Sequence, residues 1–125
     1  MIPILVRAIV LASALLLAAV AGAGAHAFLD RAEPRVGSTV KTPPARVRLW
    51  FTQPLEPAFS TVRVLDGSGR QVDKRDVTVD PGKPELLTVS VPSLGPGTYK
   101  VVWRVLSVDT HVTEGDFTFR VTGGP

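Results

Sequence analysis

Hydrophobic and polar residues alternate along three segments of the chain. Apolar side chains occupy every second position over 47–51, 99–105 and 117–121, with Arg, Lys or Thr at most of the positions between them. Because successive side chains of a β-strand point to opposite faces, each alternating set predicts one buried face of a strand. Valine, threonine and aromatic residues, which favour strands, dominate these segments. The large side chains that this alternation assigns to the core are Tyr99, Trp103 and Phe117.

Turn-forming residues separate the predicted strands. Asp-Gly-Ser-Gly at 66–69 predicts a hairpin, and Asp-Pro-Gly at 80–82 and Gly-Pro-Gly at 95–97 predict two further turns. No window favours a long amphipathic helix. Many short strands between turns predict an all-β fold, either a sandwich or a small barrel. The seven predicted strands lie near 27–33, 46–52, 60–65, 70–79, 85–91, 98–107 and 115–122.

The start of the chain differs in composition from the rest. Arg7 precedes an uncharged stretch over 8–25 that ends in Ala and Gly. A basic residue, an apolar centre and a small-residue end predict a secretory signal peptide over residues 1–25. Ala-Gly-Ala at 23–25 fits the A-x-A cleavage pattern, so His26 would open a single mature domain spanning 26–125.

Three other interpretations remain open at this end. Cleavage could follow Ala23 or Ala27 instead, and an uncleaved stretch could serve as a membrane anchor. Cleavage after Ala27 would discard His26 and leave Phe28 first. The small-residue end favours cleavage over an anchor, and no second apolar span follows. We therefore expect a soluble protein exported to the periplasm.

Composition excludes several functions. The chain has no Cys, so disulfides, thiolate metal sites and cysteine nucleophiles are impossible. Its 14 Lys and Arg exceed its 11 Asp and Glu by only three and form no basic run, so no nucleic-acid partner is expected. The motifs of serine hydrolases, phosphate-binding loops and zinc proteases are absent, so we expect no enzyme.

The two histidines, His26 and His111, carry the candidate chemistry. A terminal histidine offers its α-amine, whose pKa is near about 8, and its ring nitrogen, which together chelate a metal. In an extended segment, Asp109 and His111 would point the same way. Three nitrogen ligands and an oxygen suit Cu(II) best among the common divalent metals. His26 alone would be better explained as a frayed terminus, and Asp109 with His111 alone as a polar strand end.

Four motifs span nearly the whole predicted mature domain. They are His-Ala-Phe-Leu at 26–29, Leu-Trp-Phe-Thr-Gln-Pro-Leu at 49–55, Tyr-Lys-Val-Val-Trp-Arg-Val-Leu-Ser-Val-Asp-Thr-His at 99–111, and Gly-Asp-Phe-Thr-Phe at 115–119. Together they resemble the CopC family of periplasmic copper-binding proteins. The resemblance implies a Greek-key β-sandwich, cupredoxin-like or immunoglobulin-like.

The resemblance also implies one Cu(II) ion per chain. Its ligands would be the amine and ring of His26, the ring of His111, and Asp109 as a weaker oxygen ligand or a hydrogen-bond partner. Some members place a Glu where this chain has Gln53, which supplies no carboxylate. Others hold Cu(I) in a methionine-rich loop, but the only methionine here is Met1, so no thioether site is expected. Polar support around the site, including a group that orients His111 through its other ring nitrogen, is expected from Ser107, Thr110 and Thr113.

The implied function is that of a monomeric copper carrier or buffer in copper resistance or homeostasis, with an inner-membrane copper importer as its partner. Two alternatives stay open. A terminal-histidine copper site also occurs in polysaccharide monooxygenases, although Trp50 and Tyr99 form no obvious sugar platform. A metal-free sandwich module for adhesion or assembly would predict that His26 and His111 lie far apart.

Overall fold

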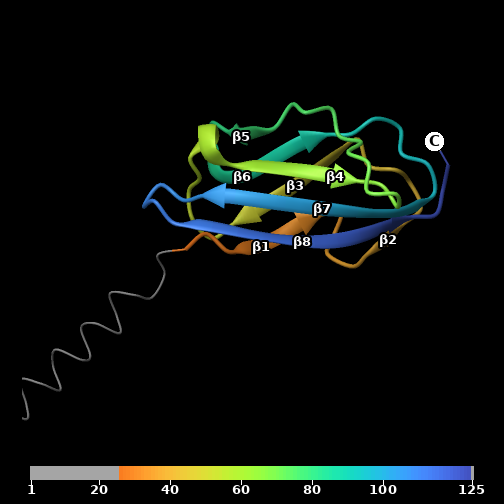
Figure 1. The fold of residues 1–125 in the computed structure, drawn as a ribbon, viewed down its shortest axis with the longest axis horizontal. Helices are drawn as coiled ribbons and strands as arrows, with labels where there is room; N and C mark the ends of the chain where they lie inside the picture. Colours follow the sequence, from red (N-terminus) through yellow and green to blue (C-terminus); the bar gives the residue numbers. More distant parts are fainter. Residues whose placement is uncertain (1–25, 125) are drawn as a thin grey trace, which may run out of the picture.

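Eight strands form two sheets of four that lie one over the other (Figure 1). The structure is a computed structural model that describes residues 26–124, so the predicted signal peptide lies outside the described residues. The first sheet has the order β1 (Leu29–Glu33), β3 (Arg46–Phe51), β6 (Lys83–Ser90), β5 (Thr78–Asp80). The second has the order β2 (Thr39–Val40), β8 (Val112–Val121), β7 (Gly97–Leu106), β4 (Thr61–Leu65). The predicted all-β sandwich is confirmed.

The core lies between the two sheets and follows the alternation in the sequence. The buried alternating residues are Val47, Leu49 and Phe51 of β3, Tyr99, Val101, Trp103 and Val105 of β7, and Phe117, Phe119 and Val121 of β8. Phe51 and Trp103 meet edge to face across the sheets, with ring centroids 5.1 Å apart. Burying each such side chain contributes roughly 1.5–3 kcal/mol. Packing and hydrogen bonds, without any disulfide, therefore hold this fold together.

The predicted strand over 70–79 is wrong for most of its length. The turn after β4 forms as expected, with the Asp66 amide donating to the Arg70 carbonyl at 2.8 Å. Beyond it, the buried Asp73 carboxylate accepts the Val64 amide of β4 at 2.8 Å. The Asp73 side chain thus replaces a backbone carbonyl as the partner of β4, and regular strand pairing resumes only in β5. The two-residue β2, which pairs in parallel with β8, has no signal in the alternation.

One end of the sandwich gathers three connecting segments. The start of β1, the β7–β8 turn and the 3-10 helix η1 (Pro57–Phe59) all lie at the left end in Figure 1. Backbone bonds tie the β7–β8 turn to the segment before η1, because the Glu56 amide donates to the Leu106 carbonyl at 2.8 Å and the Val108 amide to the Pro54 carbonyl at 3.1 Å. His26 lies just before β1 and His111 lies in the β7–β8 turn, so this end holds both histidines. No helix in residues 26–124 is long and apolar enough to cross a membrane.

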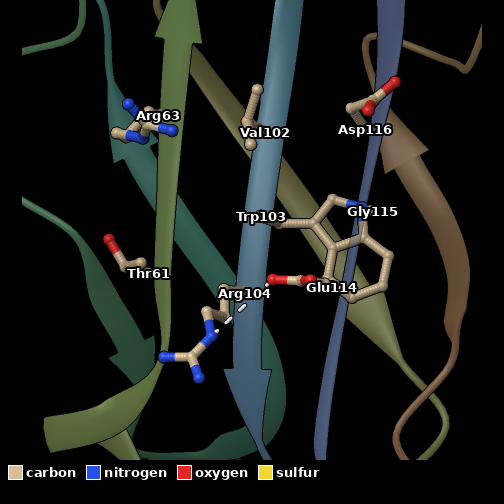
Figure 2. A pocket seen from close by; sticks show the side chains of 8 residues that line it. All are labelled: Thr61, Arg63, Val102, Trp103, Arg104, Glu114, Gly115 and Asp116. Atoms are coloured by element: carbon tan, nitrogen blue, oxygen red, sulfur yellow. Dashed lines mark ion pairs between the residues drawn. The ribbon is translucent and has the colours of Figure 1, made fainter.

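Gly115 of β8 makes room for the Trp103 indole, which lies across it (Figure 2). A Cβ at Gly115 would lie 2.6 Å from Cζ2 of Trp103. We expect Gly115→Ala to lower the free energy of unfolding by about 1–3 kcal/mol, because the ring must move from its packed position. Urea unfolding followed by tryptophan fluorescence measures the loss. The control is Gly95→Ala, whose Cβ meets nothing within 4 Å; equal stabilities for the two variants would contradict the packing argument.

Candidate metal centre

The segment that precedes β1 is fixed by both sheets. Ala27 is fully buried. Thr52, just after β3, accepts the Phe28 amide at 2.9 Å and donates its hydroxyl to the His26 carbonyl at 3.4 Å. From the other sheet, the Thr113 hydroxyl of β8 donates to the Ala27 carbonyl at 2.6 Å. The backbone on either side of Ala27 is therefore held in place, and with it the position of the His26 ring.

The rings of His26 and His111 meet at the end of the sandwich. Their centroids are 4.7 Å apart, and the ring planes are inclined at 74°. Metal–imidazole bonds are about 2 Å long, so two imidazole nitrogens on one ion lie within about 4 Å of each other. The two rings lie within reach of a shared ion. This proximity is the opposite of what a metal-free module predicted.

The segment from Ser107 to His111 is a turn, so the expectation of an extended Asp109–His111 segment is wrong. The Thr110 backbone amide donates to the Ser107 carbonyl at 2.9 Å, and the Ser107 backbone amide donates to the His111 carbonyl at 3.0 Å. Thr110 closes the turn with a φ of +72°, in the left-handed region. The turn nevertheless brings Asp109 Oδ1 to 3.6 Å from His111 Nδ1.

Ser107 is the buried centre of this turn. Its side chain is inaccessible to solvent. The hydroxyl oxygen donates to Asp109 Oδ1 and lies 3.2 Å from the carbonyl oxygen and 3.3 Å from the amide nitrogen of His111. One hydroxyl thus positions both the carboxylate and the histidine backbone. Asp109, rather than one of the three hydroxyl residues expected in this role, is the group that faces the His111 ring.

The electrostatics of the turn keep Asp109 charged. The hydrogen bond from Ser107, followed by the interaction with His111, holds the pKa of Asp109 below its ordinary value of 3.8. The carboxylate is therefore ionised throughout the range from pH 5 to pH 7. The side chains of His111 and Asp109 are 44% and 46% exposed, so an ion bound here would lie at the protein surface.

Other polar residues of this region serve different contacts. Within residues 26–124, no three His, Cys, Asp or Glu side chains gather closely enough to hold a metal ion by themselves. Glu114 lies on the outer face of the second sheet, where it pairs with Arg104 at 3.7 Å (Figure 2). The shallow hollow on that face contains neither histidine and is lined by Thr61, Arg63, Val102, Trp103, Arg104, Glu114, Gly115 and Asp116.

Tyr99 and Trp50 do not offer a flat platform for a sugar. Tyr99 is 7% exposed and stacks on Phe119 in the core, with ring centroids 5.6 Å apart. The Arg31 guanidinium covers Trp50, with its central carbon 3.8 Å from the ring centroid. Neither side chain is available to stack on a polysaccharide, as the sequence led us to expect.

The structure is thus a β-sandwich with two histidine rings side by side at one end and no Cys or Met among residues 26–124. The CopC domain model matches residues 29–122. The chain belongs to the CopC family. The matched residues include Asp109 and His111 and begin after His26.

Curated relatives and solved structures agree with this assignment. Copper resistance protein C of Xanthomonas campestris pv. juglandis is 35% identical over 108 residues, which cover 81% of this chain and 84% of that protein. Protein YobA of Escherichia coli K12 is 33% identical over 101 residues, covering 78% and 79%. The crystal structure of CopC from Methylosinus trichosporium OB3b has a TM-score of 0.71 at 38% identity, covering 78% of this chain and 95% of that one.

Two further similarities show how the domain varies. PcoC, a methionine-rich copper resistance protein from Escherichia coli, gives a TM-score of 0.67 at 29% identity, covering 78% and 99%. Copper transport protein CutJ of Bacillus subtilis is 28% identical over 98 residues, but these cover only 18% of its length. Proteins of this family are copper-binding resistance proteins and not enzymes. The expected β-sandwich fold, copper as the bound metal and the non-enzymatic class are therefore confirmed.

Ser107→Ala should destabilise the turn. We expect a loss of about 1–3 kcal/mol in the free energy of unfolding, because the buried Ser107 hydroxyl that contacts Asp109 and the His111 amide is removed. The pKa of Asp109 should rise toward its ordinary value, so the loss should be largest above about pH 4 and shrink as pH falls through the lowered wild-type pKa. Urea unfolding at several pH values tests this. The exposed Ser93→Ala is the control, and a pH-independent difference would contradict the electrostatic part.

Proposed function

We propose that the mature protein begins at His26 and carries one Cu(II) ion between His26 and His111. The observation that supports the proposal is the 4.7 Å separation of the two rings. The α-amine and ring nitrogen of His26 would form one chelate, and the ring of His111 would add a third nitrogen. Such a site lets a periplasmic protein hold copper as a carrier or buffer in copper resistance or homeostasis.

The donor set favours oxidised copper. Imidazole and amine nitrogens suit Cu(II), whereas thiolates and thioethers select Cu(I). The chain has no Cys, and its single methionine, Met1, belongs to the predicted signal peptide. PcoC, by contrast, is described as methionine-rich. The protein would therefore carry copper in one oxidation state at one site.

Asp109 is best explained as the group that holds the His111 ring. Its carboxylate is fixed by Ser107 and faces Nδ1 of His111 at 3.6 Å. A metal-bound histidine commonly pairs its second ring nitrogen with a carboxylate, which fixes the ring orientation and strengthens the ligand. Nε2 of His111 would then be the atom that binds copper, with Asp109 beside the ion rather than in direct contact.

The proposed partner is an inner-membrane copper importer. The copper transport protein CutJ supports this, because its segment similar to this chain lies within a much longer protein. The domain described here would act as a monomer in the periplasm. It would present its copper at the exposed end of the sandwich, where the partner can reach it.

Replacing the ring of His111 tests the ligand assignment. We expect His111→Ala to weaken Cu(II) binding by more than about 100-fold, and His26→Ala to do likewise, because each removes a ligand. Asp109→Asn should cost less, about 10- to 100-fold, since only support for the ring is lost. Competition titration with a chelator of known affinity gives the values. Equal affinities for wild type and His111→Ala would refute the site.

The free terminal amine should make binding dependent on both processing and pH. Intact mass of periplasmic protein is expected to show His26 first, and one extra Gly before His26 should weaken Cu(II) binding at pH 7. Affinity should fall steeply from pH 7 to about pH 5, because protons compete with Cu(II) for each imidazole and amine nitrogen ligand. Asp109 stays ionised over this range, so it contributes none of the loss. If the extended and native proteins bind equally at every pH, the amine is not a ligand.

A further inference from the structure

The Thr113 hydroxyl links the two halves of the candidate site directly. It donates to the Ala27 carbonyl at 2.6 Å, although the two residues are 86 positions apart in the chain. Thr113 follows His111 by two residues at the start of β8, and Ala27 directly follows His26. This single bond therefore closes a short loop of covalent and hydrogen-bonded atoms that runs from one histidine to the other.

The two threonines that hold the terminal segment differ in what they fix. Thr52 accepts the Phe28 amide and follows a strand of the first sheet, which carries neither histidine. Thr113 belongs to the strand that emerges from the His111 turn and is itself partly buried, paired with Val105 of β7. Motion of the terminal segment relative to His111 must therefore break or bend the Thr113 bond.

We infer that Thr113 is a positioning residue that sets the separation of the His26 and His111 rings before metal arrives. The inference rests on the proposed function. Chain ends fray unless they are tied down, and an ordered ligand saves the entropy of fixing it on binding. Because the bond goes to the backbone of Ala27, it persists after cleavage before His26.

The matched variants are Thr113→Val, which keeps the β-branched shape and removes the hydroxyl, and Thr113→Ser, which keeps the hydroxyl. Thr118→Val makes the same change on the exposed face of the same strand. In metal-free mature protein, we expect the nuclear Overhauser effects between the two histidine rings to weaken in Thr113→Val alone. Cu(II) affinity should drop roughly three- to tenfold, the loss of one hydrogen bond, and Thr113→Ser should restore it.

Electron paramagnetic resonance adds a readout that a purely structural role would not move. Thr113→Val should shift the Cu(II) signal as the geometry of the nitrogen ligands changes, while Thr118→Val should match wild type. Unchanged ring separation, affinity and Cu(II) signal in folded Thr113→Val would overturn the positioning role. If the rings move apart in metal-free Thr113→Val, the positioning role is supported whether or not wild type binds Cu(II). Failure of wild type to bind Cu(II) would refute the proposed function instead.

Discussion

The burial of Ala27 between the two sheets is the constraint on which the candidate site depends. A single methyl side chain contributes little apolar area, about 0.8 kcal/mol per carbon group. Hydrogen bonds from both sheets to the neighbouring backbone supply the rest of the anchoring. A chain end that would otherwise fray becomes a fixed element of the fold. His26 can meet His111 because the residue that follows His26 is held from two sides.

The fold follows from the sequence wherever burial follows a period of two. The alternating apolar residues over 47–51, 99–105 and 117–121 all lie in the core because they face the opposite sheet. The prediction fails where a side chain replaces backbone pairing. Asp73 satisfies the Val64 amide through its carboxylate, so the hydrophobic residues around it form no strand. The parallel contact of β2 with β8 joins distant parts of the chain, and two residues are too short to show a period.

The candidate site was predictable in its residues but not in its geometry. The chain has only two histidines, so the candidate ring ligands were few. The motifs that resemble the CopC family then singled out Asp109 together with His111. Spacing alone suggested that Asp109 and His111 point the same way along a strand. The positive φ of Thr110 shows that a turn achieves the proximity instead. The contacts of Ser107, Thr52 and Thr113 depend on tertiary packing, so threonine and serine positions in the sequence gave only a general expectation of polar support.

The hydrophobic core and the candidate metal site lie in different parts of the domain. This separation determines whether the proposed carrier would stay folded when it releases copper. In small metallodomains that fold around their ion, the metal-binding free energy is part of the folding free energy, so losing the metal unfolds the protein. Here the core side chains of the two sheets lie between them, while His111 and Asp109 lie half-exposed at one end. The ring pair is already assembled by hydrogen bonds that involve no metal. Copper could therefore leave the proposed site without disturbing the packing that keeps the sandwich folded, as the proposed carrier role requires.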